Sequence, residues 1–224
     1  MNNEGLLAGV DGVAWSDLEH AYGPATDIPA MLRAVAGDDD ASRDRAITAL
    51  FGSICHQGDV YEAAAEAVPF IAELARDAAM TPDHRRLLVA LLGCIAAGED
   101  EEARDAVAAQ FAALLTPLAG ANARMDWNLA FAASQVADSA GASTGLLDGL
   151  AGQTADPQLP AALALTRALV TGAPASDALE LAAASLRDDD RGQSDDERAE
   201  NPTRWPRALA ELLFEEGFEQ EDVR

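Results

Sequence analysis

Apolar residues recur three and four positions apart through most of the chain, the spacing that places them on one face of a helix. Five segments each carry two apolar residues four positions apart near their C-terminal ends: Leu50/Ile54, Leu91/Ile95, Ala132/Val136, Leu165/Leu169 and Leu209/Leu213. Successive pairs begin 41, 41, 33 and 44 positions apart. A second helical segment precedes each, over 27–36, 60–78, 101–118, 143–151 and 175–187. The pattern therefore predicts five helix pairs.

Composition agrees with a fold built from helices alone. Apolar residues make up 49% of the 224 residues but aromatic residues only 5%, and alanine is the commonest type. Alanine has the highest helix propensity, whereas sheets favour β-branched and aromatic residues. A repeat near 40 residues has the length of a HEAT or armadillo unit. We predict an all-α protein, a HEAT-like α-solenoid of about five helix pairs in a single domain.

The segments outside the repeat have other predicted roles. Residues 1–26 do not fit the repeat and are predicted to cap the first helix pair, with Trp15, Leu18 and Tyr22 as apolar anchors. The helical repeats then cover 27–187. The segment 188–203, DDDRGQSDDERAENPT, is almost without apolar residues and is predicted to be a mobile acidic loop. A final helix is expected over 204–217.

Several segments resemble known HEAT repeats. DDDASRDRAITALFGSI (38–54) and TPDHRRLLVALLGCIAAG (81–98) each combine an acidic turn, an early arginine and an Ala-Leu pair. The segments WSDLEHAYGP (15–24), ICHQG (54–58) and AVPFI (67–71) are similar to a group of actinobacterial HEAT-repeat proteins that has no assigned activity. The resemblance implies an α-solenoid and carries no catalytic residues. In it, His56 and Gln57 are expected to satisfy carbonyls at a helix end.

The charge of the chain points to its class of partner. All 15 basic residues are arginines, and 39 acidic residues bring the net charge to −24. Such a charge repels nucleic-acid phosphates and anionic membranes but attracts basic proteins. We therefore expect a basic protein or peptide as partner, and neither nucleic acid nor membrane; the competing interpretation is that the charge serves only to keep the protein in solution. The predicted acidic binding edge consists of Asp38, Asp39, Asp40, Glu99, Asp100, Glu101, Glu102, Asp188, Asp189 and Asp190.

The second helices of such repeats line a concave surface, and one face of them carries suitable binding residues. Arg45, Arg86, Trp127 and Arg204 each stand nine residues before the second member of an apolar pair, and Arg167 lies on the same face. Asn128, Phe131 and Gln135 continue this surface in the middle unit. It would form a shallow groove for a peptide, with arginines pairing carboxylates and Trp127 stacking. The competing interpretation is that Arg43, Arg45, Arg85 and Arg86 tie adjacent units to acidic turn residues.

The sequence offers few candidates for catalytic or metal-binding residues. Cys55 and Cys94 lie in apolar helical runs and are predicted to be ordinary core residues of a protein in a reducing compartment. Cys55 and His56 are adjacent, and neighbours on a helix do not face each other. The cysteines and histidines lack zinc-site spacing, and a calcium loop starting at Asp188 would meet Gln193 and Ala199 where glycine and glutamate are needed. No metal, cofactor or catalytic residue is therefore predicted.

Three functional hypotheses follow from these patterns. The first is a cytoplasmic, monomeric, non-enzymatic protein-interaction module, in its most concrete form an immunity- or antitoxin-type inhibitor of a basic partner. The second is a small-molecule-binding protein or lyase-type enzyme whose site lies around Trp127, Asn128, Phe131 and Gln135. The third is a DNA mimic. It is less favoured because the acidic residues occupy turns at both edges of the predicted repeat.

Overall fold

The computed structural model describes residues 5–56, 59–150, 158–186 and 188–222, and it is mostly α-helical. Four predicted helix pairs are present, and the two helices of the fifth are separated by a further helix. The helices of the described residues are α1 (Ile28–Ala36), α2 (Asp40–Ile54), α3 (Ala63–Arg76), α4 (Pro82–Ala97), α5 (Glu101–Leu118), α6 (Ala123–Gln135), α7 (Thr144–Leu150), α8 (Gln158–Thr171), α9 (Ser176–Ser185), α10 (Asp188–Glu200) and α11 (Trp205–Asp222).

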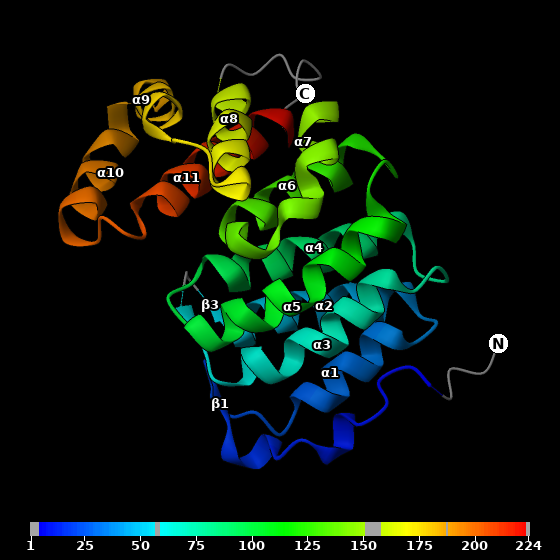
Figure 1. Cartoon of the computed structure of the whole chain (residues 1–224). Coiled ribbons are helices and arrows are strands. Elements are labelled where there is room, and N and C mark those ends of the chain that lie inside the picture. Colours follow the sequence, from blue (N-terminus) through cyan, green and yellow to red (C-terminus); the bar gives the residue numbers. More distant parts are fainter. Residues whose placement is uncertain (1–4, 57–58, 151–157, 187, 223–224) are drawn as a thin grey trace.

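The helices stack in the order of the sequence. In Figure 1 the colours run from blue at one end of the molecule through green to yellow and red at the other. Within each pair the two helices pack together, α1 on α2, α3 on α4, α5 on α6 and α7 on α8. The first helices α1, α3 and α5 also contact one another in succession, as do the second helices α2, α4, α6 and α8. The first six helices therefore form two layers, and α8 extends the second one.

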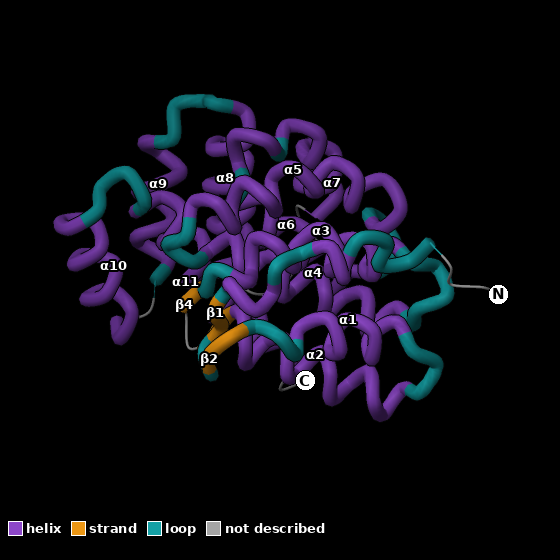
Figure 2. Tube along the Cα trace, turned by 90° about the horizontal axis from the view of Figure 1, so that it is seen from below, coloured by secondary structure: helices purple, strands orange, loops and turns teal. Residues whose placement is uncertain are grey.

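Two short antiparallel hairpins interrupt the helical pattern. Strand β1 (Glu19–His20) pairs with β2 (Gly23–Pro24), and β3 (Cys55–His56) pairs with β4 (Asp59–Val60). The backbone N–H of Ala21 donates to the carbonyl of Ser53, which joins the first hairpin to the end of α2. Both hairpins lie on one side of the helices (Figure 2). The prediction of an all-α chain is wrong for these four strands.

Polar residues begin the central helices. Asp39, Thr81, Asp100 and Asn122 each accept a hydrogen bond from the backbone N–H three residues later. Each bond satisfies one of the N–H groups that have no partner within a helix, which fixes where the helix starts. The bonds from Ser42 lower the pKa of Asp39. Asp27 holds the N-cap position of α1 without a capping bond from its side chain, because its carboxylate lies 2.8 Å from His20 Nε2.

At three corners between helices, an arginine four residues after the capping residue joins its helix to the preceding one. Arg43 Nε donates to the carbonyl of Val35, Arg85 Nε to that of Ala75, and Arg104 Nε to that of Ala96. Each carbonyl belongs to the end of the preceding helix, where carbonyls lack helical partners. Arg43 and Arg85 thus tie helices together, as the competing interpretation expected, although each joins the two helices of one pair and not adjacent units. Their main partners, however, are carbonyls rather than acidic side chains.

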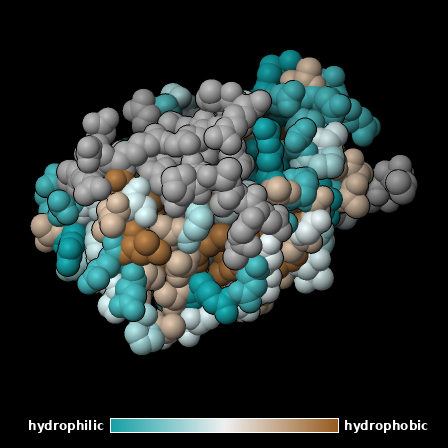
Figure 3. Space-filling view, turned by 90° about the horizontal axis from the view of Figure 1, so that it is seen from above, coloured by the Kyte–Doolittle hydropathy of each residue, from teal (hydrophilic) through white to brown (hydrophobic). Residues whose placement is uncertain are grey.

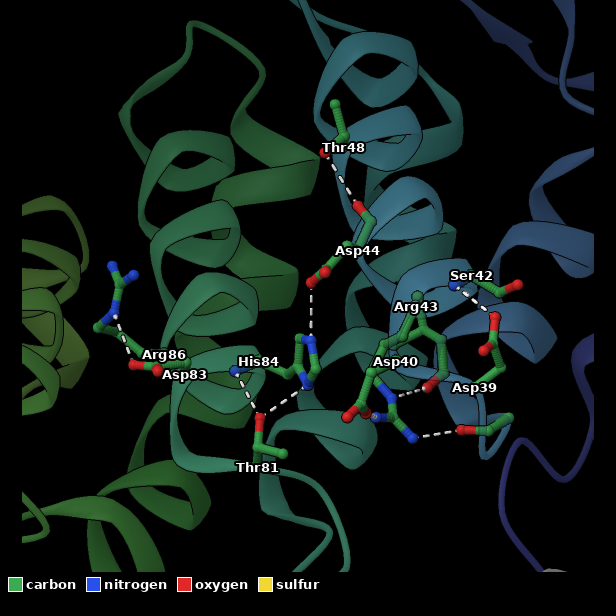
Figure 4. A network of polar contacts seen from close by, with 12 residues as sticks. Asp39, Asp40, Ser42, Arg43, Asp44, Thr48, Thr81, Asp83, His84 and Arg86 are labelled. Carbon is green, nitrogen blue, oxygen red and sulfur yellow. Dashed lines mark hydrogen bonds and ion pairs between the residues drawn. The ribbon is translucent and has the colours of Figure 1, made fainter.

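The close-up of the first two units shows a further link between them. His84 Nε2 lies 2.8 Å from Asp44 Oδ1, so the start of α4 is connected to α2 (Figure 4). The other ring nitrogen lies 2.7 Å from the Thr81 hydroxyl. In the same view, Arg43 pairs with Asp40 of its own helix. The polar residues of the turns therefore fix how neighbouring helices are stacked.

Two segments differ from their predicted structure. Residues 188–200 form α10, so the prediction of a mobile loop over 188–203 is wrong for them. The reason is tertiary: Trp205 Nε1 donates to the buried Ser194 hydroxyl, and the Arg198 guanidinium lies 4.7 Å from the centre of the Trp205 ring. In the N-terminal segment Trp15 is buried as predicted, whereas Tyr22 is 71% exposed and is not an apolar anchor.

Gly52 and Gly93 occupy the same place in two successive units and differ in their surroundings. A Cβ atom on Gly93 would lie 2.7 Å from Phe131 Cδ1, whereas one on Gly52 would meet only the Tyr22 hydroxyl at 3.8 Å. Alanine in a helix is favoured over glycine by about 0.5–1 kcal/mol where space allows. We therefore expect Gly52→Ala to be neutral or stabilising. Gly93→Ala should instead lower the free energy of unfolding by about 1–3 kcal/mol through overpacking, and urea denaturation of both variants tests the difference in sign.

Candidate ligand cavity

The last helix crosses the layer formed by the second helices. α11 packs on α8 and α9 but also contacts α6 and α4 directly. Its Phe214 ring lies 6.3 Å from the ring of Trp127 and 5.9 Å from that of Phe131, both on α6. All three side chains are at least 95% buried. The inner surface that was predicted to hold a peptide is therefore partly covered by the chain itself.

A cavity of about 400 Å³ remains between α11 and the layer beneath it. Its wall is built from both halves of the chain, with α2, β3, α4 and α6 on one side and α10 and α11 on the other. The lining residues are Phe51, Cys55, Ala90, Cys94, Ala97, Gly98, Asn128, Phe131, Gln193, Glu197, Arg204, Ala208, Glu211, Leu212 and Phe214. Most of the lining is apolar, with a small set of polar groups, the composition typical of small-molecule sites.

Arg204 organises the charged part of the cavity. Its guanidinium donates to Glu197 Oε1 at 3.1 Å and to the carbonyl of Ala97 at 3.0 Å, and it lies 3.7 Å from Glu211 Oε2. The side chains of Arg204, Glu197 and Glu211 are each about one-quarter exposed. Among the residues that line the cavity, two carboxylates thus share one guanidinium.

The two cysteines meet in the same cavity. Both are half-buried rather than enclosed in the core, so their prediction as ordinary core residues is wrong. A hydrogen bond from the Cys94 thiol lowers the pKa of Cys55, although burial and the Glu211 carboxylate both act to raise it. Cys55 and His56 are successive residues of β3, whose side chains point to opposite faces, and the His56 ring lies 5.8 Å from that of Tyr22. The neighbouring Gln57 and Gly58 lie outside the described residues.

Three of the eight residues predicted for the concave surface line the cavity: Asn128, Phe131 and Arg204. Trp127 and Gln135 are only 2% exposed and belong to the packing beneath α11. Gln135 Nε2 donates to Ser134 Oγ and to the carbonyl of Arg207. The prediction that Trp127 stacks on a ligand is wrong, because α11 supplies Phe214 as its aromatic neighbour.

The remaining three predicted residues, Arg45, Arg86 and Arg167, do not line the cavity. Arg45 donates to Ser42 Oγ on the exposed side of α2, and Arg86 Nε lies 4.0 Å from Asp83. Arg167 pairs with Asp148 of α7. The spacing in the sequence did not bring these arginines to the cavity, because α11 approaches only part of the layer.

The predicted acidic edge falls on the turns before α2 and α5 and on the start of α10. Asp38, Glu99, Glu101 and Glu102 are exposed. Asp39 and Asp100 cap helices, and Asp40 pairs with Arg43, so these three carboxylates have structural partners. Asp188, Asp189 and Asp190 begin α10, and their side chains lie outside the described residues.

Among the lining residues that were not predicted from the sequence, four carry thiol or carboxylate side chains: Cys55, Cys94, Glu197 and Glu211. Glu211 had a signal, because it occupies the same repeat position as Gly52 and Gly93 on the predicted inner face. Glu197 had none, since its segment was expected to be a loop. The cysteines had no spacing signal, and only the stacking of α4 beside the end of α2 brings them together.

Comparison with family models, with curated proteins and with solved structures found no match to this chain. The HEAT resemblance therefore rests on the residues quoted above. None of the helices in the described part of the chain combines the length and apolar character that a membrane crossing requires. The described residues also contain no cluster of three or more histidine, cysteine or acidic side chains able to hold a metal ion.

Proposed function

We propose that this protein binds a small amphipathic molecule in the cavity beneath α11. The observation that carries the proposal is the cavity of about 400 Å³, lined mainly by apolar residues from both halves of the chain. Phe51, Phe131 and Leu212 would contact the apolar part of the ligand. We further propose that α2, α4, α6 and α8 are the inner wall of an α-solenoid, which α11 closes to make the binding site.

The polar wall indicates the charge of this ligand. Among the lining residues, Glu197 and Glu211 share the guanidinium of Arg204, and a cationic group of the ligand would be attracted to these two carboxylates. The net charge of −24 favours the entry of cations and opposes that of anions. The proposed ligand class is therefore an apolar molecule with one amine or other cationic group.

Octylamine and octanoate test the proposal, because they share an apolar chain and carry opposite charges at neutral pH. We expect octylamine, used below its micelle concentration, to raise the melting temperature and octanoate to leave it unchanged. A ligand at one hundred times its dissociation constant stabilises a protein by about 2.7 kcal/mol. Equal responses to the two compounds, or none to either, would contradict the proposed ligand class.

A matched pair of variants locates the binding site. Ala90 lines the cavity, and Ala49 occupies the same repeat position on α2 without lining it. We expect Ala90→Trp to fill the cavity and abolish the octylamine shift, whereas Ala49→Trp should retain it. If the shift survives in folded Ala90→Trp, the amine binds elsewhere on the protein.

A second candidate function is inhibition of a basic protein, supported by the exposed carboxylates of Asp38, Glu99, Glu101 and Glu102. On the part of the surface drawn in colour in Figure 3, hydrophobic residues lie between hydrophilic ones, as on a solvent-facing surface. A partner held by these carboxylates should be retained from native cytosol at low salt and released as salt rises. It should also be lost when the four residues are replaced by their amides. Retention of no basic protein at low salt would rule out this function.

A further inference from the structure

The only two cysteines of the chain lie side by side, although they come from different helix pairs. Cys55 follows the last residue of α2, where the backbone has left the helix with φ −141°. Cys94 lies in the last turn of α4. Both line the cavity, both are half-buried, and their thiols are near enough to hydrogen-bond. Small molecules that enter the cavity therefore meet two adjacent thiols.

We propose that Cys55 and Cys94 are a reactive dithiol that reduces low-molecular-weight disulfides and closes to an intramolecular disulfide. The assignment does not depend on the cavity binding an amphipathic ligand. The surroundings of the two thiols also favour disulfide chemistry over metal binding. A site for a metal ion needs more ligands than two thiols, and the described residues offer no cluster of three or more suitable side chains.

The two thiols have different roles in this reaction. The Cys94 thiol hydrogen-bonds to Cys55 and lowers its pKa, which favours the thiolate form of Cys55. Thiolates, not thiols, attack disulfides. Cys55 is therefore the attacking residue, and Cys94 is the resolving residue that completes the exchange.

The exchange proceeds in two balanced steps. The Cys55 thiolate attacks one sulfur of a disulfide RSSR, which forms a mixed disulfide and breaks the RS–SR bond. The released RS⁻ takes up the proton that Cys55 lost. Cys94 then attacks the Cys55 sulfur, forming the Cys55–Cys94 bond and releasing the second RS⁻, which takes the proton of Cys94. Two protein thiols are oxidised, and one small disulfide is reduced to two thiols.

Incubation of the reduced, folded protein with oxidised glutathione tests the proposal. Intact-mass spectrometry after alkylation should show a monomer that has lost two hydrogen atoms, contains no free thiol and carries no glutathione. In Cys94→Ser the mixed disulfide cannot be resolved, so we expect one stable glutathionyl adduct on Cys55. In Cys55→Ala the adduct on Cys94 should form more slowly, since Cys94 then has no neighbouring thiol or hydroxyl donor to favour its thiolate.

The pH dependence of alkylation separates a reactive dithiol from two merely accessible thiols. Loss of the Cys94 hydrogen bond should move the midpoint of Cys55 alkylation to higher pH in Cys94→Ala, while Cys94→Ser, which keeps a donor, should move it less. The proposal is overturned if the wild-type protein retains a glutathione adduct or forms linked dimers. It is equally overturned if both thiols stay free in the folded protein but react in urea.

Discussion

Replacement of Trp127 by alanine is expected to lower the free energy of unfolding by about 3–5 kcal/mol, the range for truncating a large buried aromatic side chain. Trp127 is 2% exposed and packs edge-on against Phe214 of α11. The substitution would therefore leave a void at the contact between α6 and the last helix. Urea denaturation followed by circular dichroism measures the loss.

Trp205→Ala is the matched control for this prediction. Trp205 is half-buried and contributes one hydrogen bond to Ser194 and one contact with the Arg198 guanidinium. These interactions together are worth about 1–2 kcal/mol. If Trp127→Ala costs no more than Trp205→Ala, α11 does not pack on α6 as described, and the cavity between them loses its basis.

Arg43→Met is expected to lower the free energy of unfolding by about 2–4 kcal/mol, although methionine keeps much of the apolar length of the side chain. Arg43 is only 7% exposed, and it donates to the carbonyls of Val35 and Gly37 while pairing with Asp40. Without the guanidinium, both carbonyls at the end of α1 would be left without this donor, at about 1–3 kcal/mol for each buried group. Chemical denaturation gives the size of the effect.

Arg45→Met provides the control on the same helix. Its side chain is 72% exposed, lies 4.0 Å from Asp39 and donates only to Ser42 within α2. Substitutions at such surface positions change stability by no more than about 0.5 kcal/mol. A similar loss in both variants would show that the corner formed by Arg43 has no special role in stacking α1 on α2.

The proposed ligand site and the dithiol can be tested separately. The octylamine experiment depends on the volume and charge of the cavity, whereas the glutathione experiment depends only on the two sulfurs. A protein that fails the first and passes the second would retain the assignment of Cys55 and Cys94. If only the glutathione experiment fails, the proposal of an amphipathic ligand still stands.

The contrast between Gly52 and Gly93 shows that the sequence repeat does not predict which neighbour a residue meets. Both glycines occupy the same position in successive helix pairs, 41 residues apart, and both lie on the same face of their helices. Only Gly93 meets Phe131, because α6 packs across α4 at that position. The local period predicts the face on which a residue lies, but the neighbour on that face depends on the angle and offset of the next helix.

The amino-acid sequence by itself determined the helices and their pairing, because apolar spacing, capping residues and arginines after the caps act within one or two turns. Only the tertiary structure decided that 188–200 is helical, that α11 packs on α4, α6 and α8, and that Cys55 meets Cys94. These features depend on contacts between residues far apart in the chain, such as Arg204 with the carbonyl of Ala97 and Phe214 with Trp127. Such contacts leave no local period, because each forms once and is fixed by packing rather than by spacing.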